Sequence, residues 1–138
     1  MSTIRCIALA SAAVAGLIGV GPAVAHHSTA AFDTAQVVKI EGTITQFRWI
    51  NPHASIKIDG GAGVGLWTIE MTAPNVLINE GWTRDALQPG DKVTMYVNPL
   101  RNAVTLNDGS TGGLFVGVVL TNGNTLGRTD GKGAGTSN

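Results

Sequence analysis

The chain has 138 residues, of which 43% are hydrophobic and 13% are charged, and its nine basic residues balance nine acidic ones. That length suits one compact domain, and the composition is too apolar for a disordered protein. The balanced charge lacks the basic surplus with which nucleic-acid binders displace counterions, so we do not expect nucleic acid as a partner.

The N-terminus has the pattern of a signal peptide. Arg5 is the only charged residue before Asp33, and an apolar run over residues 7–20 ends at a helix-breaking Gly-Pro pair and the cleavage pattern Ala23-Val24-Ala25. The run of about 14 residues is too short for a bilayer, which needs ~20. We therefore predict a signal peptide over residues 1–25, export to the periplasm or outside the cell, and no transmembrane segment after processing.

Cleavage after Ala25 would leave a processed chain of residues 26–138 and would remove Cys6, the only cysteine. The processed chain would then have neither a disulfide nor a thiolate ligand or nucleophile. Its stability in an oxidising compartment would have to come from packing alone.

The sequence of the processed chain predicts three strands, a short helix and two further strands, in that order. Alternating apolar residues indicate the strands, and a proline start with a glycine stop indicates the helix. The strands are expected over residues 36–50, 54–59, 66–71, 92–97 and 114–120, and the helix over 74–81. Trp82, directly after the helix, is expected to pack back onto the sheet.

The first strand changes its apolar face midway. Ile40 and Ile44 lie at even-numbered positions, on one face of the strand, whereas Phe47 and Trp49 lie at odd-numbered positions, on the other face. A strand that exchanges its buried face needs a bulge or a bend, which we expect near Gly42 or Gln46.

Five strands with a helix between the third and fourth are typical of an OB-like barrel, and the fold class is therefore mainly β. A small β-sandwich is the alternative. The barrel domain is expected over residues 26–126, followed by a disordered tail over 127–138. OB folds often bind nucleic acids or sugars, but a shared fold does not establish a shared function.

The three histidines are the most specific chemical feature of the sequence. His26 and His27 would open the processed chain, and His53 lies in the turn Asn51-Pro52-His53. An α-amine has an ordinary pKa of about 8 and an imidazole one of about 6.5, so both are available as donors near neutral pH. The amine and Nδ1 of His26 could chelate one metal, with His53 or His27 as the third nitrogen donor. Such a set suits Cu(II), with Ni(II) or Zn(II) as weaker candidates. The alternative is that His26 and His27 form a solvated terminus and that His53 only completes a turn.

A second candidate surface combines aromatic and basic residues. Arg48 and Trp49 precede the Asn-Pro turn, and Trp82 and Arg101 could lie on the same side of the barrel. Together they could line a ligand groove or a partner-binding face, although aromatic residues beside arginine also occur in ordinary core and rim packing. No spacing pairs two carboxylates for acid–base chemistry, so the sequence indicates no catalytic group of its own.

Several short segments of the chain together form a distinctive pattern. In chain order they are His26-His27-Ser28 with Ala31-Phe32-Asp33, Glu41-Gly42-Thr43-Ile44-Thr45, Trp49-Ile50-Asn51-Pro52-His53-Ala54, Pro74-Asn75, Gly81-Trp82-Thr83-Arg84 with Leu87, and Gly90-Asp91. This pattern resembles one small secreted bacterial family, the domain of unknown function 6152, in which the segments have the same order. The resemblance covers roughly residues 26–120 and includes all three histidines. It implies an exported β domain and brings no established activity. Thr29 and the Asn98-Pro99-Leu100-Arg101 segment depart from the family pattern, and neither departure includes a histidine.

The leading hypothesis is a non-catalytic periplasmic binding module, with copper as its candidate metal and His26, His27 and His53 as candidate ligands. The alternative is a structural accessory protein without metal, which binds an envelope partner or a small ligand through Trp49, Trp82 and Arg101. A third hypothesis is a copper-dependent redox enzyme.

Overall fold

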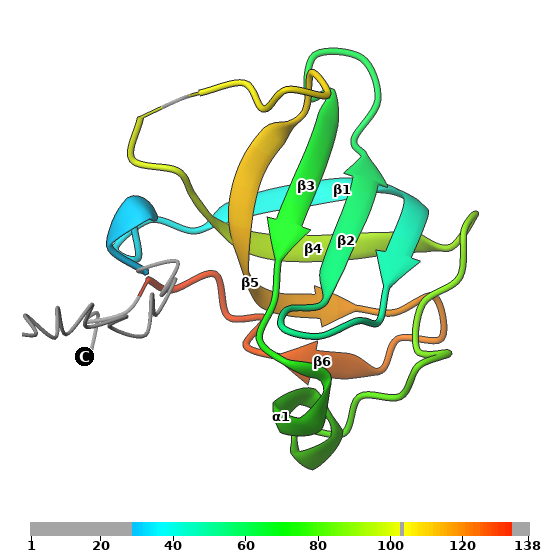
Figure 1. Ribbon diagram of the computed structural model, residues 1–138. Coiled ribbons are helices and arrows are strands. Elements are labelled where there is room, and N and C mark those ends of the chain that lie inside the picture. Colours follow the sequence, from blue (N-terminus) through cyan, green and yellow to red (C-terminus); the bar gives the residue numbers. More distant parts are fainter. Residues whose placement is uncertain (1–28, 103, 134–138) are drawn as a thin grey trace, which may run out of the picture.

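The computed structural model describes residues 29–102 and 104–133 (Figure 1). The predicted signal peptide and His26 and His27 lie outside the described residues. Within the described ranges, no helix is long and apolar enough to cross a membrane. The elements in chain order are η1 (Thr29–Ala31), β1 (Val38–Arg48), β2 (Ser55–Asp59), β3 (Leu66–Glu70), α1 (Pro74–Asn79), β4 (Lys92–Pro99), β5 (Thr111–Val119) and β6 (Thr125–Gly127).

The strands close into a barrel because the two ends of a five-stranded run also pair with each other. The order is β3-β2-β1-β4-β5, with antiparallel neighbours, and β3 pairs with β5 in parallel from Trp67 and Thr111 to Glu70 and Leu114. With α1 between β3 and β4, this is the arrangement of an OB-type barrel. The predicted mainly β, OB-like barrel is confirmed. The sandwich alternative is wrong, since the described strands all belong to one closed sheet (Figure 1).

The first strand serves both halves of the barrel. Residues 38–43 of β1 pair with β4, and residues 43–48 pair with β2. The β2 register shifts between Ile44 and Gln46, which is the predicted bulge, and the buried face changes after Ile44. Gly42 lies where β1 approaches β2 most closely, because a Cβ there would overlap the carbonyl oxygen of Asp59.

The core consists of the inward-facing apolar side chains of the strands, closed at one end by residues from α1 and the segment after it. Burial of one such isoleucine or leucine contributes about 1.5–3 kcal/mol relative to leaving it exposed. The largest fully buried side chains are Ile40, Ile44, Ile56, Ile58, Ile69, Leu77, Trp82, Leu87, Met95, Val97 and Val118.

The end of α1 directs Trp82 onto the barrel. Pro74 occupies the first turn, where a missing N–H costs no helical hydrogen bond. At the other end, the Trp82 N–H donates to the Leu77 carbonyl (3.0 Å) and the Gly81 N–H donates to the Ile78 carbonyl (3.1 Å). These two bonds form a Schellman cap, and Gly81 supplies its left-handed residue with φ of 88°. Trp82 therefore packs against the barrel, as the sequence predicts.

Part of the segment that the sequence assigns to a disordered tail makes contacts with the barrel domain. Residues 125–127 form β6, which pairs with β5, and the Arg128 N–H donates to the Val116 carbonyl (2.8 Å). Gly133 is buried and approaches Ala35 so closely that a Cβ would overlap its carbonyl oxygen. Backbone hydrogen bonding holds this segment although its sequence is polar and rich in glycine. Residues 134–138 lie outside the described part.

Candidate functional site

The first described residues are attached to the segment that follows β4. Phe32 is buried and forms a β-bridge with Leu100. Arg101 adds two hydrogen bonds, from its backbone N–H to the Ala31 carbonyl (2.9 Å) and from its Nε to the Ala30 carbonyl (3.0 Å). Because one side chain is buried and two carbonyls are bonded, η1 has a defined position on the barrel.

This attachment brings Thr29 and His53 to the walls of one hollow. His53 is exposed in the turn between β1 and β2, and the hollow has a volume of about 170 Å³. The remaining walls come from the residue after η1, from the end of β3 with the two residues after it, and from β5, and they consist of Phe32, Glu70, Met71, Thr72 and Leu114. The described chain therefore begins beside the one histidine among the described residues.

The two other histidines precede this point by a short stretch of chain. His26 is three residues before Thr29, and three extended residues span at most about 10 Å. Within residues 29–102 and 104–133, no group of three histidine, cysteine, aspartate or glutamate side chains could hold a metal ion. A three-nitrogen site at this hollow would consequently need at least one donor from residues 26–28.

The predicted aromatic and basic face is not assembled as one surface. Trp82 is only 2% exposed and makes ring contacts with Phe115 (centroids 5.2 Å apart) and Phe47 (5.9 Å). Trp49 is half-buried and packs edge-on against Phe47 at 5.7 Å. The two tryptophans therefore belong to an aromatic cluster that packs the α1 end of the barrel.

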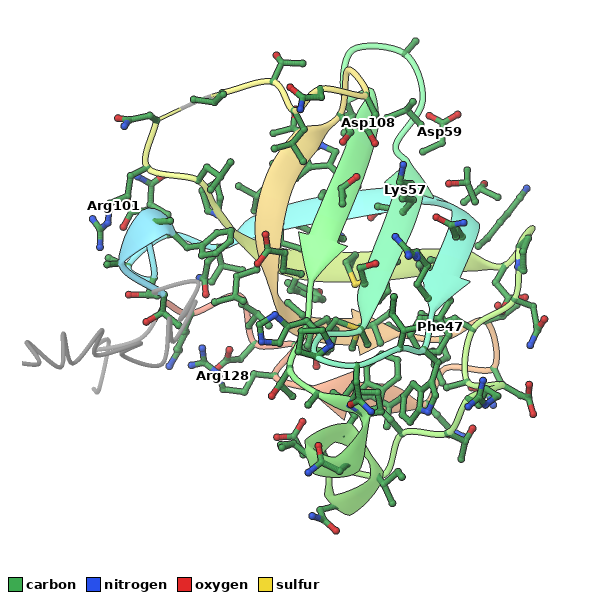
Figure 2. The ribbon with its side chains drawn as sticks, viewed as in Figure 1. Phe47, Lys57, Asp59, Arg101, Asp108 and Arg128 are labelled. Carbon is green, nitrogen blue, oxygen red and sulfur yellow. The ribbon has the colours of Figure 1, made fainter. Side chains whose placement is uncertain are left out.

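The two arginines of that predicted face lie apart. Arg48 is exposed at the end of β1, one residue after Phe47. Figure 2 shows Arg101 and Phe47 on opposite sides of the molecule. Arg101 bonds η1 and lies 3.9 Å from the carboxylate of Asp33, so its observed role is to hold the start of the described chain.

A polar network that the sequence did not predict attaches the β4–β5 loop to β2 and β3. The Asp108 carboxylate accepts hydrogen bonds from Lys57 Nζ (2.6 Å) and from the Ser110 hydroxyl (2.6 Å) and N–H (3.1 Å). The Ser110 and Thr68 hydroxyls are hydrogen-bonded at 2.8 Å. The hydrogen bond from Lys57, followed by those from Ser110, holds the pKa of the Asp108 carboxyl well below its usual range. Hydrogen bonds to the ionised carboxylate, and not burial, therefore dominate the pKa of Asp108.

The sequence did not identify Phe32 and Glu70 as residues of a site, although the family resemblance includes Phe32. Phe32 stands in a polar stretch, and Glu70 is one of several outward-facing polar residues on strands. An isolated phenylalanine in a polar lead-in is the only sequence feature that could have indicated the attachment. Nothing local indicated that Glu70 and His53 share a wall, since that depends on how β3 and the β1–β2 turn meet.

A comparison with protein families gives a match over most of the chain. A family of unknown function, DUF6152, matches residues 13–114. The chain belongs to this family. The match begins within the apolar N-terminal run and ends before Leu120, so its limits differ from the 26–120 range of the predicted resemblance. No curated protein and no solved structure matches the chain significantly.

Proposed function

We propose that the protein is an exported, non-catalytic binding module that holds copper through its processed N-terminus. Removal of residues 1–25 in the periplasm would expose the amine of His26. That amine and the His26 imidazole would chelate Cu(II), and His53 would supply the third nitrogen. The observation that carries the proposal is that Thr29, three residues after His26, lines the same hollow as His53.

The donor chemistry of these residues suits copper. An amine and two imidazoles are nitrogen ligands of intermediate softness, and among divalent first-row metals Cu(II) binds such sets most strongly. The carboxylate of Glu70 lines the hollow as well, and a negative charge near the site favours a bound cation. His27 is the alternative third ligand, because it follows His26 directly.

The attachment of η1 supports the proposal energetically. A metal site assembled from a free terminus must order that terminus on binding, which costs about 1–2 kcal/mol for each backbone residue fixed. Phe32 and the Arg101 hydrogen bonds already fix the chain from Thr29 onward. The chain from Thr29 onward would therefore not add to this cost when copper binds.

The test compares Cu(II) affinities of the processed chain and two matched variants, His53→Gln and His27→Gln, by competition with a chelator of known affinity. We expect His53→Gln to weaken binding by more than about tenfold, since even residues that only orient a ligand contribute that much. His27→Gln should leave the affinity nearly unchanged. Circular dichroism of both variants checks that the turn still folds.

The opposite ranking, with loss only in His27→Gln, would assign the third ligand to His27 and remove His53 from the site. Unchanged affinity in both variants would contradict a site at this hollow.

A further inference from the structure

A second, larger hollow adjoins the first on the same side of the barrel. It has a volume of about 470 Å³ and shares Met71, Thr72 and Leu114 with the hollow beside His53. Ligand pockets for small organic molecules have volumes of about 300–1,000 Å³, so the space is sufficient for such a molecule. Its apolar walls come from Leu77 of α1 and from Phe115 of β5 with its neighbours.

Backbone contacts position the charged side of this hollow. Gly127 approaches β5 so closely that a Cβ would overlap the Val116 carbonyl oxygen, and the next N–H, that of Arg128, donates to the same carbonyl at 2.8 Å. Arg128 therefore starts from a fixed backbone position. Figure 2 shows its side chain beside the segment that links β3 to α1, which supplies the shared residues Met71 and Thr72.

Two opposite charges line this hollow without neutralising each other. Arg128 comes from the segment after β6, and Glu80 comes from the end of α1. The ion pairs among the described residues are Lys39–Glu41, Lys57–Asp108 and Arg101–Asp33. Among the residues that the structure describes, Glu80 and Arg128 thus line the hollow as an anion and a cation without an ion-pair partner, beside apolar walls.

We propose that this hollow binds zwitterionic ligands with an apolar body, namely a free apolar amino acid or a short apolar peptide with free ends. The ligand carboxylate binds the Arg128 guanidinium, whose planar donor pair matches a carboxylate. The ligand ammonium group binds Glu80, and its side chains contact Leu77, Leu114 and Phe115. The inference is independent of copper, because His53, the proposed metal ligand among the described residues, does not line this hollow.

The test is a titration of the ¹⁵N-labelled, metal-free processed chain with leucine and with leucyl-leucine, followed by amide chemical shifts. We expect saturable shifts at residues 77–81, 114–116 and 127–128. Arg128→Gln and Glu80→Gln should each weaken binding by about tenfold, as expected for a lost hydrogen bond between charged groups. Arg84→Gln, which changes an exposed arginine that does not line the hollow, is the matched control and should bind like the wild type.

The relative affinities of the two probes distinguish the source of the ligand, and either order supports the proposal. Tighter binding of leucyl-leucine indicates peptides, and equal or tighter binding of leucine indicates amino acids. The proposal is overturned if neither probe shifts these amides. It is equally overturned if N-acetyl-leucine amide, which has no charged ends, binds as well as leucine, or if Arg128→Gln retains full affinity.

Discussion

The carboxylate of Asp108 joins three segments that are distant in sequence. It accepts hydrogen bonds from Lys57 of β2 and from Ser110, the residue before β5, and Ser110 is in turn hydrogen-bonded to Thr68 of β3. The Lys57–Asp108 pair is partly exposed, and exposed pairs alone contribute little to stability. The Ser110 side chain is 2% exposed, so loss of its acceptor would leave a buried hydroxyl with fewer partners.

Asp108→Asn should lower the melting temperature by a few degrees at neutral pH. Because the folded-state pKa of Asp108 lies below its unfolded value, the ionised carboxylate contributes stability above the ordinary aspartate pKa of about 3.9. That contribution is lost as the pH falls from there toward the folded-state pKa. Between pH 7 and about pH 4, the melting temperatures of the variant and the wild type should differ by a constant amount. Below about pH 4 this difference should become smaller.

Asp85→Asn is the matched control, because Asp85 is exposed. Its melting temperature should equal that of the wild type at every pH. A difference that widens on acidification would contradict this role of Asp108.

Trp82 belongs to the buried core among the described residues. Trp82→Ala should cost about 3–5 kcal/mol in free energy of unfolding, a large fraction of the stability of a small domain. Within the described residues the Trp82 Nε1 has no hydrogen-bond partner, so Trp82→Phe loses no hydrogen bond and can keep ring contacts with Phe47 and Phe115. In chemical denaturation, the free energy of unfolding should therefore be highest for the wild type, lower for Trp82→Phe and lowest for Trp82→Ala. Equal stability of Trp82→Ala and the wild type would contradict the core role and would favour the hypothesis that Trp82 binds a ligand or partner.

At the level of elements, the strands and the helix were predictable because each carries a local pattern. The bulge of β1 followed from the change of parity between Ile44 and Phe47, and the helix followed from Pro74 and Gly81. β6 was not predictable, since a three-residue strand has no measurable periodicity and is defined by its pairing with β5.

The segment after β6 should stabilise the barrel. We expect a processed chain that ends at Leu126 to melt at a lower temperature than one that ends at Gly133. The shorter chain loses the Gly127 pairing, the Arg128–Val116 hydrogen bond and the packing of Gly133 against Ala35. Thermal denaturation of the two chains measures the difference. Identical melting temperatures would support the disordered tail that the sequence predicted.

At the level of the whole molecule, the sequence could identify candidate residues but could not decide which of them meet. Trp82 and Arg101 were predicted to lie on the same side of the barrel, whereas Trp82 is buried and Arg101 attaches η1. Thr29 and His53 are 24 positions apart, and their shared hollow depends on the bridge between Phe32 and Leu100. Such placements come from barrel closure, which no local pattern encodes.

The same closure explains why two hollows adjoin on one side of the barrel. The end of β3 and the middle of β5 separate where their pairing stops at Glu70 and Leu114. Met71, Thr72 and Leu114 then line both spaces, one beside His53 and one between α1 and the segment after β6. A metal and an organic ligand could consequently be held next to each other without sharing a charged residue.

The most direct test of the copper proposal concerns the amine of His26. Cu(II) affinity should be measured for the processed chain that begins at His26 and for the same chain with its α-amine acetylated. Acetylation keeps every side chain and removes the amine as a donor, and with it the chelate between the terminal amine and Nδ1 of the same residue. We predict that acetylation weakens binding by about tenfold or more; equal affinity of the two chains would contradict the proposed site.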